Sequence, residues 1–164
     1  MRVKVADYGR LPRARTVPCE GRRLHPAAAP LLAKMLDAAA LALGERPRLA
    51  SAWRAHRWRD RAHYEVFLVQ RYGSVTKGRR WLAFDSPHET GLAVDFGSMG
   101  LRPSSATAEA QRRAPLYLWL LAHAAEFGWH PYLAEPWHWE CPLPRDVWAG
   151  VRDLSPGDGP PWKL

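Results

Sequence analysis

Two short segments contain side chains that could hold a metal ion and a catalytic base. The first runs from Ser86 to Asp95 and includes His88, and the second runs from Glu135 to His138. Two imidazoles and two carboxylates suit a catalytic Zn²⁺ ion, which takes three protein ligands and leaves one position open. Such a site also needs a polar group that stays off the metal and accepts a proton from water. Glu135 is the natural candidate for that base.

The spacing of these residues leaves other interpretations open. A His near an Asp is a common arrangement, and Glu135 with His138 could form a solvated ion pair. In a flat strand these two side chains would point to opposite faces. Both can serve one site only if the chain bends at Pro136, which disfavours a helical conformation for the residue before it. The residue types therefore favour a zinc site without excluding ordinary ion pairs.

The elements that must position these residues follow from hydrophobic periodicity and from stop signals. We expect helices over 26–43, 58–72 and 115–127, and strands over 48–53, 91–96 and 137–141. Gly44, Gly73 and Gly128 follow the three helices, where a glycine commonly ends a helix. Residues 74–90 form a loop long enough to indicate a functional role. Because the loops around 91–96 are too irregular for parallel crossovers, we expect an α+β fold, with a small antiparallel sheet flanked by helices.

The length of 164 residues fits one domain with a real core. We expect an N-terminal arm over 1–24, a domain over 25–150 and an irregular tail over 151–164, which is rich in Pro and Gly. Cys19 and Cys141 could form a disulfide or be two free, small hydrophobic residues, and we favour free cysteines. His25, His56, His63 and His123 have no carboxylate at ligand spacing and are expected to be structural or solvated. His130 is the exception, because it lies near the second segment in sequence and could polarise the substrate.

The chain is strongly basic, with a formal net charge of +8 and 20 arginines among its 24 basic residues. Such a surface favours anionic partners, and an anionic cell-wall polymer is one partner class; a generally basic surface is the alternative. No nucleic-acid-binding motif accompanies the charge. The N-terminus lacks the apolar run of a signal peptide, and no segment approaches the ~18 apolar residues of a membrane span. We expect a monomer.

At the two segments the sequence resembles the D-alanyl-D-alanine carboxypeptidase and dipeptidase family of zinc peptidases. This family includes vancomycin-resistance carboxypeptidases and several phage endolysin domains. Its motifs are S-x-H-x-x-G-x-A-x-D, then E-x-W-H about 40 residues later, with an upstream S-G-Y-R-like segment. The matching residues are Ser86, His88, Gly91, Ala93 and Asp95; Glu135, Trp137 and His138; and Ser51 to Arg54, with Ala52 for Gly and Trp53 for Tyr.

The resemblance implies that His88, Asp95 and His138 ligate Zn²⁺ and that Glu135 is the base that activates the metal-bound water. It also implies that Arg54 binds the substrate carboxylate or stabilises the oxyanion, an interaction that suits the planar guanidinium. Ser86 would bind substrate or brace the metal loop. The family often has Gln five residues after the arginine, where this chain has Arg59, and that difference leaves the exact substrate contact open.

The resemblance implies hydrolysis of peptidoglycan peptides or their precursors, by a carboxypeptidase-like or endolysin-like endopeptidase activity. The site of action would then be the cell wall, periplasmic or extracellular. One alternative is a non-enzymatic, zinc-stabilised binding module, because the Hedgehog signalling domain shares this zinc fold. Another is a zinc peptidase that acts on a peptide that is not a component of the cell wall. A free Glu135 beside a complete ligand set argues against a purely structural metal, which needs no base.

Overall fold

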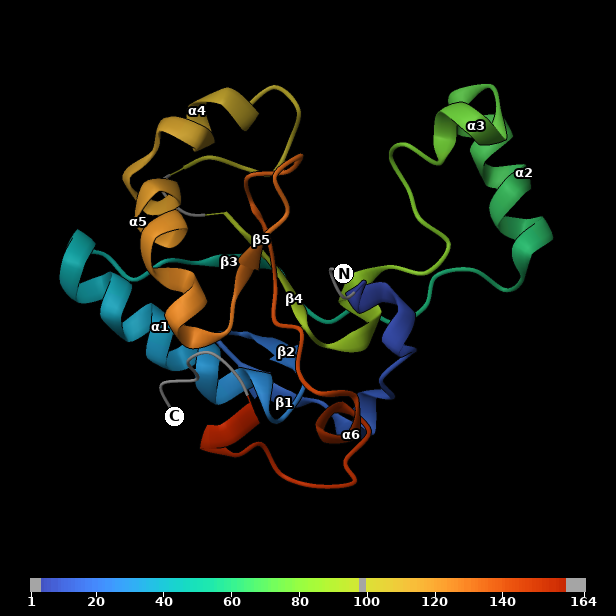
Figure 1. The fold of residues 1–164 in the computed structure, drawn as a ribbon. Helices are drawn as coiled ribbons and strands as arrows, with labels where there is room; N and C mark the ends of the chain where they lie inside the picture. The colour runs from blue at the N-terminus through green and yellow to red at the C-terminus, as the bar shows by residue number, and fades with distance from the viewer. Residues whose placement is uncertain (1–3, 98–99, 159–164) are drawn as a thin grey trace.

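The computed structural model describes residues 4–97 and 100–158, and its centre is a four-stranded antiparallel sheet with the order β3-β4-β6-β5 (Figure 1). Its strands are β3 (Leu49–Ser51), β4 (Ala93–Phe96), β5 (His130–Pro131) and β6 (His138–Glu140). A separate hairpin pairs β1 (Val17–Cys19) with β2 (Arg22–Leu24). The helices are α1 (Ala28–Leu43), α2 (Arg61–Tyr72), α3 (Val75–Gly78), α4 (Ala108–Arg113), α5 (Pro115–His123) and α6 (Arg145–Trp148). The α+β prediction is confirmed.

Helix α1 supplies much of the core because its apolar residues recur at helical spacing. Leu32, Met35, Leu36 and Ala39 are fully buried, as the periodicity predicts. Gly44 ends the helix in the left-handed conformation, with φ 77°, and its N–H donates to the carbonyl of Ala40. Helix α5 packs against α1 beside the sheet (Figure 1).

Strand β4 is an internal strand of the sheet, because β3 and β6 pair with it on its two sides. Ala93, Val94 and Phe96 are buried in the core, and only Asp95 is half-buried. The central position of β4 fixes the direction of the Asp95 side chain through hydrogen bonds on both edges of the strand. A rigid strand is a precise support for a functional group.

The second helix and the long loop after it differ from expectation in their boundaries. Helix α2 begins at Arg61 and not at 58, because the side chain of Asp60 accepts a hydrogen bond from the N–H of His63 and caps the helix there. The segment 74–90 contains helix α3 and the 3₁₀ helix η3 (Pro87–Thr90), where an irregular loop was expected. Helices α4 and α6 were also not predicted, since each spans only a few residues.

Helices α2 and α3 form a lobe, residues 57–84, that stands apart from the sheet (Figure 1). The lobe has a small core of its own, in which Trp58, Tyr64 and Leu68 are buried. Gly78 lets α3 approach α2 closely, because a Cβ atom there would lie 2.7 Å from side-chain atoms of Leu68. The lobe is therefore a packed unit and not a loose loop.

The N-terminal segment is more ordered than its prolines indicate. It contains the 3₁₀ helices η1 (Val5–Tyr8) and η2 (Arg13–Arg15) before the β1–β2 hairpin. The side chains of Val5 and Leu11 are buried. At the other end, η5 (Pro156–Asp158) interrupts the expected irregular tail, whose residues 159–164 lie outside the described part. Within the described residues, no helix is both long and apolar enough to span a membrane.

Candidate metal centre

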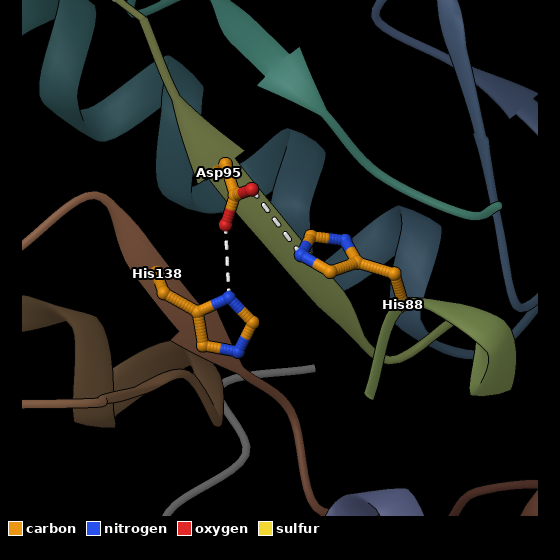
Figure 2. A group of neighbouring side chains, drawn as sticks. All are labelled: His88, Asp95 and His138. Atoms are coloured by element: carbon orange, nitrogen blue, oxygen red, sulfur yellow. Dashed lines mark hydrogen bonds and ion pairs between the residues drawn. The ribbon is translucent and has the colours of Figure 1, made fainter. Parts of the chain in front are cut away.

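Strand pairing brings Asp95 and His138 together. In the antiparallel register of β4 and β6, these two residues are direct partners. Directly opposed residues project to the same face of a sheet with their Cβ atoms about 5 Å apart. The Nδ1 atom of His138 lies 2.8 Å from Oδ1 of Asp95 (Figure 2). The fold therefore places two of the three predicted ligands side by side, although 43 residues separate them in sequence.

His88 reaches the same carboxylate from η3. Ser86 caps this short helix: its hydroxyl accepts a hydrogen bond from the N–H of His88, and its own N–H donates to Oε2 of Glu89. Gly91 ends the helix with φ 72°, and a Cβ atom there would lie 2.8 Å from the backbone nitrogen of His25. Only glycine fits this turn, which delivers the chain into β4.

Hydrogen bonds outside the site orient both imidazole rings. The Nδ1–H of His88 donates to the carbonyl of Ala52 over 2.8 Å, which leaves Nε2 facing Asp95 at 3.2 Å. On the other ring, Nε2 of His138 lies 2.9 Å from Oε1 of Glu140, which leaves Nδ1 facing Asp95. Each ring thus turns one nitrogen toward a common point (Figure 2). Such outer partners fix the ring orientation of metal-binding histidines.

The three side chains form a strongly coupled, buried group. Burial raises the pKa of the Asp95 carboxyl, but hydrogen bonds from His138 and His88 outweigh this effect and hold the pKa well below its usual value. Burial lowers the pKa of His138, but hydrogen bonds to Asp95 and Glu140 outweigh burial and raise the pKa from 6.5 to about 9. The site therefore carries an anionic carboxylate that already attracts a cation.

These residues fit a zinc ion by donor type and by distance. One donor atom from each of His88, Asp95 and His138 lies within 4.8 Å of the other two. Two nitrogens and one carboxylate oxygen are zinc ligands, and three of them leave a fourth position open. We call this group the His-Asp-His cluster. Cys141, which could have closed the site as a fourth ligand, is fully buried and is not part of the cluster. Cys19 and Cys141 are both free, in agreement with the favoured expectation.

The bend that Glu135 requires is present. The N–H of Glu135 donates to the carbonyl of Tyr132, and the N–H of His138 donates to the carbonyl of Glu135, each over 3.0 Å. These are two successive turns, and Pro136 lies at the second position of the later one, as proline favours. Glu135 is half-buried, and its carboxylate has no hydrogen bond or ion pair to the described part of the chain. A carboxylate without a partner is available for chemistry.

Arg54 is tied to the site through its backbone. Its N–H donates to the carbonyl of His88 over 3.3 Å, so the residue is adjacent to a predicted ligand. Its side chain is exposed, and within residues 4–97 and 100–158 its guanidinium forms no ion pair or hydrogen bond. Ser86, by contrast, uses its side chain as the cap of η3. This hydrogen bond is consistent with a role of Ser86 in bracing the loop that carries His88. Contact between Ser86 and substrate stays a prediction.

The structure also contains a second group of histidine and carboxylate residues that the sequence did not indicate. We call His56, Asp85 and Glu89 the Glu89 cluster. Nδ1 of His56 lies 2.8 Å from Oε1 of Glu89, so the expectation that His56 lacks a carboxylate partner was wrong; His123 likewise pairs with Glu126 at 3.2 Å. The S-x-x-E spacing from Ser86 to Glu89 signals a capping box and could have placed Glu89.

Comparisons with known proteins agree with this geometry. The sequence profile of the family described as "VanY: D-alanyl-D-alanine carboxypeptidase" matches residues 21–141. Comparison with curated proteins gives no match. Three solved structures share the fold. The first is an LdcB LD-carboxypeptidase described with the molecular basis of peptidoglycan recognition; it is 24% identical, with a TM-score of 0.58 over 84% of this chain and 67% of its own.

The other two structures are similar at slightly lower identity. One is the D,D-pentapeptidase VanY, an E175A mutant, in complex with Zn(II); it is 23% identical, with a TM-score of 0.51 over 87% of each chain. The other is VanYB in complex with D-alanine-D-alanine, at 21% identity and a TM-score of 0.50 over 88% of this chain and 92% of its own. At these identities the likeness establishes the shared fold.

Proposed function

This chain belongs to the VanY D-alanyl-D-alanine carboxypeptidase family and is a zinc peptidase that acts on peptidoglycan peptides; within that role, we propose that His88, Asp95 and His138 hold the zinc ion and that Glu135 is the catalytic base. The observation that carries the proposal is the convergence of three donor atoms within 4.8 Å. Hydrogen bonds to Ala52 and Glu140 set both rings in advance.

The chemistry divides between the metal and the protein. When bound, zinc supplies Lewis-acid chemistry, because it activates a water molecule and polarises the carbonyl of the scissile bond. Glu135 accepts the proton that this water loses during attack and then donates it to the leaving amine. Glu135 suits this role because its carboxylate is unpaired in the described chain. The turn at Pro136 also ties the backbone of Glu135 to that of His138 through a hydrogen bond.

Arg54 is proposed to bind the negative charge of the substrate. Its guanidinium is exposed and unpaired within the described residues, while its backbone is anchored on His88. In a carboxypeptidase the substrate ends in a carboxylate one residue beyond the cut, which a planar guanidinium binds with two parallel hydrogen bonds. In an endopeptidase no such carboxylate exists, and Arg54 would serve the oxyanion. The carboxypeptidase assignment follows the family.

The domain limits are part of the same proposal. We assign the peptidase domain to residues 25–150, with an arm over 1–24 that packs its apolar side chains on the core and a tail from 151. The family match over 21–141 supports these limits without setting them.

The direct test is product analysis by mass spectrometry. Purified muropeptides that end in D-Ala-D-Ala would be incubated with the zinc-loaded protein and, in parallel, with the Glu135→Gln variant. We expect loss of a single terminal alanine with the native chain and almost none with the variant. Cleavage of generic L-peptides with no cleavage of muropeptides would overturn the proposed substrate class. Equal turnover by both proteins would overturn the role of Glu135.

A further inference from the structure

The net charge of the molecule is concentrated in the α2–α3 lobe. Residues 57–84 contain seven basic and two acidic residues, so this segment carries +5 of the chain's net charge of +8. Of its seven cations, only Arg59 and Arg79 pair with a carboxylate among the described residues, at 3.4 Å each. The five without a carboxylate partner are exposed: Arg57, Arg61, Arg71, Lys77 and Arg80.

Outside the lobe, some arginines are each bound by two carboxylates. Arg46 binds both Glu20 and Asp37, and Arg152 binds both Asp146 and Asp158. Surface carboxylates thus neutralise several cations outside the lobe, whereas few do so inside it. A cluster of unpaired cations produces a positive potential that attracts polyanions.

The unpaired cations of the lobe favour phosphate over other anions, and an extended ligand over a small one. Four of the five unpaired cations are arginines, whose planar fork matches phosphate oxygens. They lie on the segment before α2, on α2 and beyond α3, so they are spread along the lobe. Most aromatic rings of the lobe, such as Trp58 and Tyr64, are turned into its core, and within the lobe only the ring of Trp81 is exposed. A protein that binds single-stranded nucleic acid uses exposed rings as stacking platforms.

We propose that the α2–α3 lobe binds a phosphodiester polymer of the cell envelope and so holds the peptidase near its substrate. The proposal uses the family's action on peptidoglycan peptides to choose the polymer, but the binding itself does not depend on the catalytic mechanism. Arg57 and Arg61 already stack on aromatic rings, at 4.6 Å from Trp58 and 4.2 Å from Phe84. That stacking fixes the two guanidinium groups at the lobe surface.

The test compares two variants with the same net charge. One neutralises the lobe (Arg71→Gln, Lys77→Gln, Arg80→Gln), and the other neutralises three exposed arginines elsewhere (Arg13→Gln, Arg22→Gln, Arg102→Gln). Binding to soluble poly(glycerol phosphate) would be measured over a range of salt concentrations. We expect the lobe variant to bind at least about tenfold more weakly, with a salt slope smaller by about two, because each lost phosphate contact removes about 0.7–0.9 from the slope. The control should stay within about twofold of the native chain.

Equal losses in both variants would overturn the proposal, because only total charge would then matter. Tighter, lobe-dependent binding to single-stranded DNA with the same number of phosphates would also overturn it, in favour of a nucleic acid. Hydrolysis of a small soluble substrate should be unchanged in both variants. A loss of that activity in the lobe variant alone would show a catalytic role of the lobe and contradict a tethering surface.

A separate contact points to a positioning residue for Glu135. Arg112, on α4, donates through Nη2 to the carbonyl oxygens of Leu133 and Ala134, at 3.2 Å each. These are the two peptide groups immediately before Glu135. The same guanidinium pairs with Glu109 at 3.4 Å, which holds it in place from its own helix. Charge-assisted hydrogen bonds to two successive carbonyls restrict the backbone that carries the base.

We infer that Arg112 positions Glu135 for proton transfer, an inference that rests on the proposed role of Glu135. Arg112→Gln should lower kcat about tenfold, because small misplacements of a catalytic group cost up to about a hundredfold. The KM and the zinc content should not change. Arg113→Gln is the matched control, since Arg113 pairs with the same Glu109 at 3.5 Å and, within the described residues, forms no hydrogen bond to the turn before Glu135. We expect it to behave as the native chain.

A double-mutant cycle separates this inference from the proposed function. If Arg112 acts through Glu135, then Arg112→Gln has no further effect in the Glu135→Gln background. A full additional tenfold loss in that background would contradict the positioning role while leaving Glu135 as base. No effect of Glu135→Gln on its own would contradict the proposed function instead.

Discussion

Two clusters of histidine and carboxylate groups each take one residue from η3, and they contain similar ligand types but differ in the partners that these groups already have. The His-Asp-His cluster is His88, Asp95 and His138; the Glu89 cluster is His56, Asp85 and Glu89. In the Glu89 cluster the oxygens have protein partners. Arg10 lies 3.1 Å from Asp85 and 3.5 Å from Glu89, and the N–H of Ser86 donates to Glu89.

Among the described residues, no arginine or lysine forms an ion pair with the His-Asp-His cluster. Outer hydrogen bonds, from His88 to Ala52 and between His138 and Glu140, turn both ring nitrogens inward. The comparison teaches that proximity of ligand types does not make a metal site. A site also needs donor atoms that are not paired with an arginine or lysine, together with outer contacts that aim them.

The largest expected effect separates the two clusters by mutation. His138→Ala should remove nearly all zinc and all activity, because the two remaining ligands cannot hold the ion. His56→Ala is the matched control and should keep about one zinc per chain, since Arg10 neutralises that cluster. Metal content after dialysis, measured by atomic absorption, decides between them. Retention of zinc by the first variant and loss by the second would reverse the assignment.

The next effect separates the base from the outer carboxylate. Glu135→Gln should lower kcat about 10²–10⁴-fold while zinc affinity stays the same. Glu140→Gln should do the opposite: zinc affinity should fall about 10–100-fold, because Glu140 holds the ring of His138, while turnover at saturating zinc is largely kept. Zinc titrations and kcat measurements on both variants give this crossed pattern. Zinc loss from the Glu135 variant would show that the two carboxylates are assigned the wrong way round.

A smaller effect compares two arginines near the site, one paired and one unpaired. Arg54→Lys should lower kcat/KM about 10- to 150-fold on a substrate with a free C-terminus, since a charge-assisted fork is worth about 1.5–3 kcal/mol. Arg10→Lys should change it by no more than about twofold. Amidation of the substrate C-terminus should reproduce the Arg54 effect with the native chain. If both amidation and Arg54→Lys are harmless, Arg54 binds no substrate carboxylate.

The smallest expected effect is the change in zinc affinity with each pH unit. The raised pKa of His138, about 9, means that the metal-free protein carries a proton there at neutral pH. Because zinc requires the neutral imidazole, its affinity should rise about tenfold per pH unit up to pH 9 and then level off. In the metal-free fold the same shift is stabilising below pH 6.5, and this stabilisation is lost as the pH rises through about 9. A zinc affinity that does not change between pH 7 and 9 would contradict this coupling.

Local patterns predicted the elements well where one physical signal dominated. The periodicity of Leu32 and Leu36 predicted α1, and Gly44 and Gly73 predicted two helix ends correctly. The family resemblance and the chemistry of the donors brought out the His-Asp-His cluster. The spacing of Glu135 and His138 also required a bend at Pro136, and the structure contains a turn there.

The rest depended on contacts between distant segments. The pairing of His56 with Glu89 spans 33 residues and depends on how the lobe joins η3. The brace from Arg112 to Ala134 spans 22 residues, on a helix too short for a strong periodic signal. The partner of His138, Glu140, is only two residues away, but its role depends on which ring nitrogen faces the site. No local pattern of residue types encodes these relations.

The measurement that tests the account most directly is a crystal structure of the zinc-soaked protein with anomalous diffraction at the zinc edge. The account predicts one zinc peak per chain, within about 2.0–2.2 Å of Nε2 of His88, of Nδ1 of His138 and of an oxygen of Asp95. It predicts no peak between His56 and Glu89. A peak at the Glu89 cluster with none at the His-Asp-His cluster, or a fourth protein ligand such as Cys141, would contradict an open catalytic site.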